Sequence, residues 1–195
     1  MTLAPAPPTS KALTDIAGLD DVLGGGLVRD RVYLIEGSPG TGKTTLALQF
    51  LLAGARNGET GLYITLSETA EELRGGAASH GWSLDAIDVF ELVPPESLLD
   101  TEQQQSLLYS SDLELGETTK LIFEQVERVN PTRVVLDSLS EIRLLAQGSL
   151  RFRRQILALK HYFARHGATV LLLDDLTAEV RSEEHTSELQ SPYVI

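Results

Sequence analysis

Residues 37–44 form a glycine-rich octapeptide, Gly-Ser-Pro-Gly-Thr-Gly-Lys-Thr, which constrains this chain more than any other segment. The pattern G-x-x-x-x-G-K-[ST] surrounds a polyphosphate with backbone N–H groups, and a helix after it directs its positive end at the same anion. Lys43 can reach the β- and γ-phosphates, and the Thr44 hydroxyl can ligate Mg²⁺. The predicted cofactor-binding residues are Gly37, Ser38, Pro39, Gly40, Thr41, Gly42, Lys43, Thr44 and Thr45.

The segments on either side of this loop have the pattern that the motif requires. An apolar run before the loop predicts a strand, and the apolar residues after it predict a helix that ends at Asn57-Gly58. Strand, glycine-rich loop and helix, in this order, are the arrangement that phosphate binding needs. The alternative is a Gly/Pro turn that carries a lysine by chance, and the flanking segments disfavour it.

Strands and helices alternate along the rest of the chain, and the strands are continuously apolar. This pattern predicts an α/β fold, with a mostly parallel twisted sheet covered by helices on both faces. The polar stretch 94–116 contains no predicted element. The predicted strands are 31–36, 61–66, 87–92, 133–137 and 169–174, and the predicted helices are 43–56, 69–80, 117–130 and 149–165.

Ligands of such sheets bind at the carboxyl ends of the strands, where Asp137 falls. The run Val134-Val135-Leu136-Asp137 has the form of a Walker B strand, whose carboxylate would hold Mg²⁺ opposite Thr44, directly or through a water molecule. Many strands end in Asp, so the Walker B assignment depends on the phosphate-binding loop found upstream. We predict Thr44 and Asp137 as the metal ligands.

Two interpretations of Glu68 are open. It follows the second strand of the sheet, where its carboxylate can orient or deprotonate a water molecule that attacks the γ-phosphate. A glutamate in the first turn of a helix is also favoured by the helix dipole alone. On the first interpretation, the catalytic residues are Lys43 and Glu68. Asp174 and Asp175 can contact the γ-phosphate or a water molecule, but we favour a solvent-exposed pair at a strand end.

The composition narrows the class of protein. The net charge of −12 argues against duplex DNA as the main partner, because proteins that bind nucleic acids usually carry a basic face. The chain has no cysteine, which excludes disulfides and thiolate metal sites and fits a cytoplasmic protein. It also has no apolar run long enough for a membrane span.

The two ends of the chain carry little information about the fold. Residues 1–13, rich in Pro and Ala at the start, are expected to be a flexible tail. Residues 181–191 match the in-frame translation of a common sequencing adapter, so we expect 181–195 to be non-native. The folded domain is therefore expected at 14–180, with its C-terminal part missing.

Several motifs together resemble the KaiC-like branch of the RecA-type P-loop ATPases. The resemblance lies in 18–27, 33–46 and 61–68, and continues through 134–138 and 169–175. It implies a RecA-type core, ATP with Mg²⁺ as cofactors, and a homo-oligomeric ring or filament with nucleotide at the subunit interfaces. In this resemblance Lys43 and Thr44 match the Walker A pair, and Asp137 matches the Walker B acid.

The chain departs from the family pattern at one position of the site. Family members often have two adjacent glutamates after the second strand, and the first is the one usually assigned as catalytic in RecA-type relatives. Here the first position is Ser67 and only Glu68 remains. The family also supplies basic residues in trans from sequence after the fifth strand. The departure at Ser67 implies slow hydrolysis and leaves nucleotide binding intact.

Three functions follow from these observations. The main hypothesis is a Mg²⁺-dependent, slow ATPase of the KaiC-like group that acts in an oligomer with a regulatory role, with no identified protein partner. The first alternative is a regulatory switch that binds ATP and barely hydrolyses it, which the residue at Ser67 favours. The second is a recombinase-like, DNA-dependent ATPase, which the acidic charge and the lack of a basic loop with aromatic residues disfavour.

Overall fold

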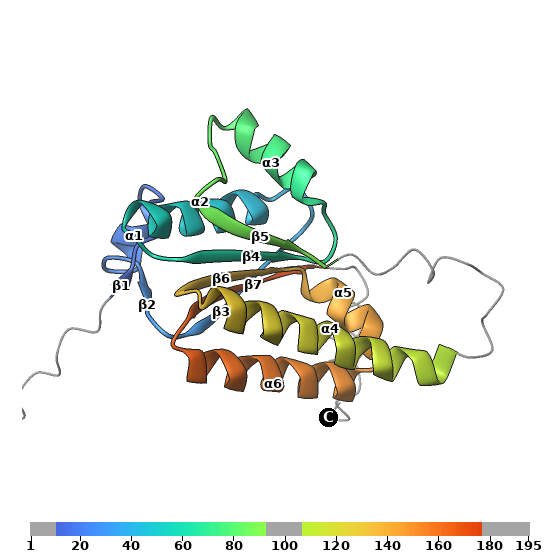
Figure 1. Ribbon diagram of the computed structural model, residues 1–195. Coiled ribbons are helices and arrows are strands. Elements are labelled where there is room, and N and C mark those ends of the chain that lie inside the picture. Colours follow the sequence, from blue (N-terminus) through green and yellow to red (C-terminus); the bar gives the residue numbers. More distant parts are fainter. Residues whose placement is uncertain (1–10, 93–106, 177–195) are drawn as a thin grey trace, which may run out of the picture.

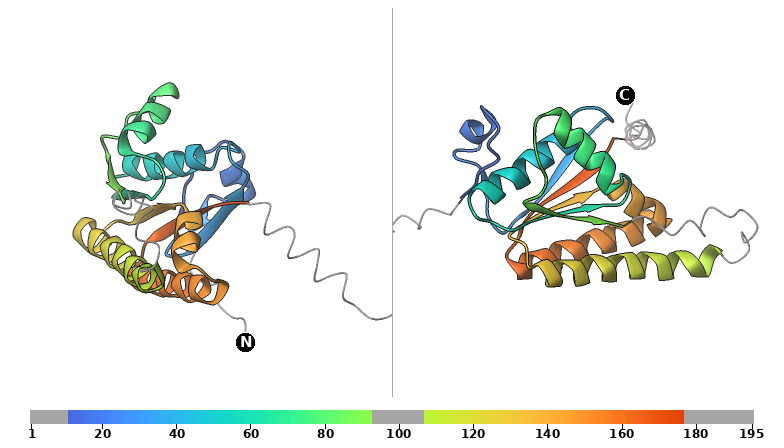
Figure 2. Two further views of the ribbon diagram at one scale, coloured as in Figure 1. Left: turned by 90° about the vertical axis from the view of Figure 1, so that its right-hand side faces the viewer. Right: turned by 45° about the horizontal axis from the view of Figure 1, so that its top comes forward.

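The computed structural model describes residues 11–92 and 107–176, with only the backbone described for 107–114. The described residues form three layers, with a parallel sheet between two layers of helices (Figure 1). Helices α2 and α3 cover one face of the sheet, and α4, α5 and α6 cover the other, as Figure 2 shows from two further directions. This arrangement confirms the predicted α/β fold.

The sheet has five parallel strands in the order β3-β7-β6-β4-β5. Because all five run in the same direction, their carboxyl ends meet at one edge of the sheet. Strands β4 and β6 are buried along their whole length, which explains their continuously apolar sequences. The strands are β3 (Val32–Gly37), β4 (Gly61–Thr65), β5 (Ile87–Glu91), β6 (Arg133–Asp137) and β7 (Thr169–Asp175).

Side chains of alternating residues along each strand enter two separate cores. Tyr63 and Val135 pack with Phe50 in the core beneath α2 and α3. Ile64 and Leu136 pack in the other core, beneath α4, α5 and α6. The helices are α2 (Lys43–Arg56), α3 (Ala70–Ser79), α4 (Leu107–Val129), α5 (Leu139–Ala146) and α6 (Ser149–His166).

The predicted helix at 43–56 is confirmed at both ends. The other predicted strands and helices agree with the structure to within one or two residues, except for the helix predicted at 117–130. Helix α4 begins at Leu107, whereas the prediction placed no element in 94–116. That prediction is wrong for 107–116, and 94–106 lie outside the described residues. Gly116 disfavours a helix by about 1 kcal/mol, but Leu115, Ile122 and Val126 bury one face of α4 against the sheet. Helix α5 was not predicted.

The N-terminal segment forms a small unit beside the sheet. Strands β1 (Lys11–Ala12) and β2 (Leu27–Val28) pair in an antiparallel manner, and helix α1 (Leu19–Val22) lies between them in sequence. Gly26 has a φ of 107°, and a Cβ atom there would lie 2.4 Å from the Ala12 carbonyl oxygen. Only glycine fits this close approach. A flexible tail was predicted at 1–13, but Lys11–Ala12 form β1 and Ala12 is buried, so that prediction is wrong for these residues. Residues 1–10 and the predicted tail 181–195 lie outside the described residues.

A buried ion-pair network stabilises the amino-terminal edge of the sheet. The Arg133 side chain is 1% exposed, donates hydrogen bonds to Glu59 at 2.9 Å, and lies 4.7 Å from the centre of the Phe50 ring. Arg29 donates to both oxygens of the same carboxylate at 2.8 Å. Hydrogen bonding from Arg29, and then from Arg133, lowers the pKa of Glu59 to about 2, with burial opposing.

This network predicts a specific loss of stability in acid. Because the pKa of Glu59 is about 2 in the folded protein and 4.5 as its ordinary value, its contribution is complete above pH 4.5 and is lost as the pH falls towards 2. Glu59→Gln should lower the free energy of unfolding at pH 7 by roughly 3 kcal/mol and flatten its decline below pH 4.5. Urea unfolding as a function of pH measures both, with the exposed Glu127→Gln as control. An unchanged acid profile in Glu59→Gln would contradict this account.

Candidate active site

The glycine-rich loop joins the end of β3 to the start of α2. Gly40 and Gly42 have φ angles of 78° and 89°, a conformation that favours glycine. The Thr41 hydroxyl donates to the Ser38 carbonyl oxygen at 2.8 Å, which closes the loop on itself. A Cβ atom on Gly37 would lie 2.7 Å from the Thr41 hydroxyl oxygen, so a larger residue there would require the Thr41 side chain to move. The loop therefore has the compact form that the sequence pattern predicts.

The Lys43 ammonium group lies over this loop. Its Nζ atom donates to the carbonyl oxygens of Gly37 at 2.8 Å and Ser38 at 3.1 Å. It also pairs with the Asp175 carboxylate at 2.7 Å, and the Lys43 side chain is 11% exposed. These contacts hold the positive charge at the carboxyl ends of β3 and β7, above the start of α2.

The two predicted metal ligands lie side by side. The Thr44 hydroxyl donates to Oδ2 of Asp137 at 3.3 Å, although the residues are 93 positions apart in sequence. The buried hydroxyl of Tyr63 donates to the same oxygen. Burial raises the pKa of Asp137, and the hydrogen bonds from Tyr63 and Thr44 oppose the shift. Burial, and then the charge of Asp137, raise the pKa of Tyr63 far above its ordinary value, so the phenol remains a donor.

The oxygen atoms of Thr44 and Asp137 suit a Mg²⁺ ion. Magnesium is held by one or two carboxylates together with substrate phosphates and water, and not by a cage of protein ligands alone. Within residues 11–92 and 107–176, no group of three or more His, Asp or Glu side chains is placed to hold a metal. The pair beside the phosphate-binding loop therefore fits a cation that phosphate oxygens and water would complete.

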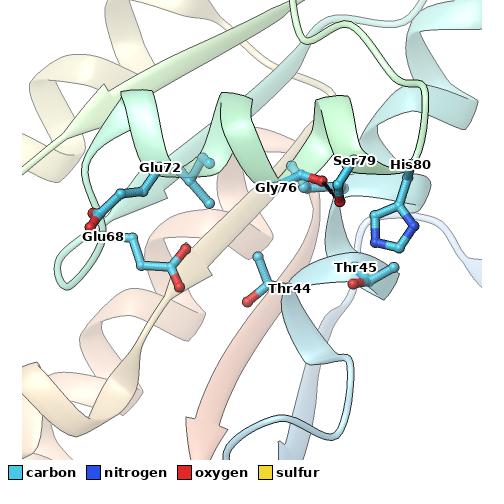
Figure 3. Close-up of a pocket in the computed structure, with 9 residues that line it drawn as sticks. Thr44, Thr45, Glu68, Glu72, Gly76, Ser79 and His80 are labelled. Atoms are coloured by element: carbon cyan, nitrogen blue, oxygen red, sulfur yellow. Dashed lines mark hydrogen bonds between the residues drawn. The ribbon is translucent and has the colours of Figure 1, made fainter.

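Glu68 lies just before helix α3 and faces Thr44 (Figure 3). The Thr65 hydroxyl accepts from the Glu68 backbone N–H at 3.0 Å and donates to its carbonyl oxygen at 2.7 Å, which fixes the turn after β4. Burial, and then the charges of Asp137 and Glu72, raise the pKa of Glu68. Helix α3 starts at Ala70 with Thr69 as its N-cap, so Glu68 is not in the first helical turn.

A cleft of about 290 Å³ runs from the phosphate-binding loop along α3 (Figure 3). Thr44 and Thr45 lie at its α2 side and Glu68 at one end, while His80 closes the other end and stacks on Trp82 with the ring centres 4.8 Å apart. The sequence analysis did not identify this cleft, because its α3 face has no motif. The residues that it adds to the site are Leu48, Glu72, Leu73, Gly76, Ser79 and His80.

The predicted solvent-exposed pair at the end of β7 is wrong for Asp174. Its side chain is 3% exposed, and it forms an ion pair with Arg143 of α5. The Ser140 hydroxyl also donates to it at 3.1 Å. Because neighbouring residues of a strand point to opposite faces, Asp175 instead faces the loop and contacts Lys43. Sequence could not show this, since helix α5 supplies the partners of Asp174.

The fold and the site define a P-loop NTPase with a RecA-type core. The family model described as "ATPase: KaiC" matches residues 12–190. A UPF0273 protein of Aeropyrum pernix is 30% identical over 173 residues, which cover 86% of this chain and 69% of that protein. The circadian clock oscillator protein KaiC of Thermosynechococcus vestitus is also 30% identical, over 87% of this chain and 32% of its own length.

A solved structure agrees with these matches. The KaiC-like protein PH0186 of Pyrococcus horikoshii OT3 superposes with a TM-score of 0.70 and 27% sequence identity, over 87% of this chain and 72% of that one. The chain therefore belongs to the KaiC ATPase family, as the motifs predict. Across residues 11–92 and 107–176, the structure contains no helix of the length and apolar character that a membrane crossing requires.

The Lys43–Asp175 contact predicts the effect of removing one charge. A phosphate bound by the loop would meet the negative charge of Asp175 as well as the positive charge of Lys43. Asp175→Asn should therefore tighten the binding of MgATP about three- to tenfold. This factor corresponds to the Coulomb repulsion between two charges a few ångströms apart at a partly exposed site. Fluorescence titration with a labelled ATP analogue measures this, with the exposed Asp88→Asn as control. Weaker binding by Asp175→Asn would instead show that the carboxylate assists the ligand.

Proposed function

We propose that this chain binds ATP with Mg²⁺ at the carboxyl ends of β3 and β6 and hydrolyses the γ-phosphate bond slowly. The observation that carries the proposal is the meeting of Thr44 and Asp137, whose side chains are 3.3 Å apart beside the phosphate-binding loop and the Lys43 ammonium group. These are the groups that a P-loop ATPase needs for phosphate and metal, and they come from two distant segments of the chain.

Each group of the site would have a separate role. The backbone N–H groups of the loop and the positive end of α2 would bind the phosphates. Lys43 would balance the charge that develops on the β- and γ-phosphates, and Thr44 and Asp137 would hold Mg²⁺. When bound, this ion would supply positive charge that neutralises the phosphates.

The cleft beside α3 supports a nucleoside triphosphate as the ligand, and not inorganic polyphosphate. It is continuous with the loop through Thr44 and Thr45, and its volume of about 290 Å³ approaches the range of small-molecule sites. Leu48 and Leu73 lie at the base of the cleft, and His80 offers a ring at the far end. The nucleoside would therefore lie between α2 and α3, with its phosphates at the loop.

Glu68 would orient the attacking water molecule. Its carboxylate shares the cleft with Thr44 and lies close enough to Asp137 for their charges to interact. A raised pKa suits a group that must accept a proton near neutral pH. Ser67 stands where the family resemblance implies a catalytic glutamate, so hydrolysis would be slow.

Ser67 also supports a second function, a regulatory switch that binds ATP and hydrolyses very little of it before release. In this case the bound nucleotide alone would alter contacts with other molecules. For either function we propose a cytoplasmic homo-oligomer, as the family resemblance implies. Large apolar side chains that are exposed in this chain, such as Leu144 and Leu150 at 76% and 74%, are candidates for burial between subunits.

Lys43→Ala tests ATP binding. The substitution removes a charge-assisted contact worth about 2–3 kcal/mol, so the affinity for MgATP should fall roughly 30- to 150-fold. Calorimetric titration measures the affinity, and Lys160→Ala, an exposed lysine on α6 at the opposite face of the sheet, is the matched control. If Lys43→Ala bound MgATP as tightly as the wild type, the site would be wrongly assigned.

Glu68→Gln separates the two functions. A water-orienting carboxylate contributes about 10²- to 10⁴-fold, so turnover in an assay of phosphate release should fall by that factor while ATP affinity stays the same. Glu71→Gln, on the first turn of α3 and outside the cleft, is the control. Turnover that is undetectable in the wild type as well as in Glu68→Gln would support the switch.

A further inference from the structure

A buried hydrogen bond joins the Tyr63 hydroxyl to the predicted metal ligand Asp137. Tyr63 lies in the middle of β4 and its side chain is fully buried. A tyrosine hydroxyl in a core needs a hydrogen-bond partner, and the partner here is the predicted metal ligand, 74 residues away in sequence.

The register of the sheet explains how the two side chains meet. Tyr63 lies opposite Val135, and Asp137 lies opposite Thr65, so Tyr63 and Asp137 are diagonal neighbours on the same face of adjacent strands. Such neighbours have Cα atoms about 7–8 Å apart, which long aromatic side chains can bridge. The phenol therefore reaches along the sheet to the carboxylate from the protein interior.

The hydroxyl groups of Tyr63 and Thr44 converge on the same oxygen of Asp137, Oδ2. A carboxylate held at one oxygen by a buried, immobile donor has a fixed plane, and its second oxygen, Oδ1, then points in a fixed direction. Metal-ligating carboxylates are commonly held by such outer hydrogen bonds, and loss of one typically weakens metal binding 10- to 100-fold.

We propose that Tyr63 is a positioning residue for the metal site: its hydroxyl fixes the orientation of Asp137 and so sets the affinity for the divalent cation that accompanies the nucleotide. This inference rests on the proposed function. Tyr63 lies beneath Asp137 in the core, and its hydroxyl contacts the two predicted metal ligands, Asp137 and Thr44. It should therefore affect the cation and leave the metal-free binding of nucleotide unchanged.

Tyr63→Phe tests the proposal, because it removes the hydroxyl and keeps the ring in the core. Mn²⁺ replaces Mg²⁺ as a paramagnetic probe, and electron paramagnetic resonance counts free Mn²⁺ in the presence of ADP. The expected result is a Mn²⁺ affinity about tenfold lower than that of the wild type, with an unchanged affinity for ADP in EDTA. Tyr162→Phe is the matched control, since its hydroxyl donates to the Phe123 carbonyl oxygen at 2.9 Å between α4 and α6.

The outcomes separate the two proposals. Equal Mn²⁺ affinity in the wild type and Tyr63→Phe would overturn the role of Tyr63 and leave the proposed function standing. A wild type that binds neither ADP nor Mn²⁺ would overturn both. Should Tyr63→Phe fail to fold, ¹⁹F NMR of the wild type labelled with fluorotyrosine replaces it, with the other tyrosines assigned by substitution. The Tyr63 signal should shift when Mg²⁺ is added to the ADP complex, and an unmoved signal would contradict the proposal.

Discussion

The proposed active site depends on the meeting of the Thr44 hydroxyl with the Asp137 carboxylate at the carboxyl edge of a parallel sheet. Thr44 lies in the first turn of α2 and Asp137 ends β6, so the two side chains come from separate elements. The parallel direction of β3 and β6 places the end of each strand at the same edge, and β7 between them fixes their separation. The geometry of the site is therefore a property of the fold, and its chemistry follows from the residues at a few strand ends.

Two acidic residues at this edge form ion pairs. Asp174 faces α5 and contacts Arg143, while Asp175 faces the loop and contacts Lys43. Asp137 accepts hydrogen bonds from two hydroxyl groups and pairs with no cation in the described residues, so a bound metal ion would balance its negative charge. At the opposite edge, Glu59 and Arg133 form a buried pair that anchors the sheet away from the site. The buried Glu59–Arg133 pair and the proposed site are thus at opposite edges of the sheet.

Much of this could be predicted from the sequence. The bounds of α2, the parallel sheet and the pairing of Thr44 with Asp137 follow from a motif whose spacing and flanking periodicity agree. Contacts that depend on the register of neighbouring strands could not be predicted, above all the contact between Tyr63 and Asp137. A tyrosine in an apolar strand fits the hydrophobic pattern as a phenylalanine would, so the sequence does not show where its hydroxyl donates. Helix α5 was not predicted, because so short a helix has no distinctive sequence pattern. The cleft beside α3 was not predicted, because the residues that line it form no motif.

The central claim is that this edge holds a triphosphate and one divalent cation together. Calorimetric titration of the wild-type protein with ATP, first with Mg²⁺ and then with EDTA, tests it most directly. The account predicts one ATP per chain and a clearly higher affinity with Mg²⁺. The absence of measurable binding by folded protein under both conditions would contradict it, as would an affinity that does not respond to Mg²⁺.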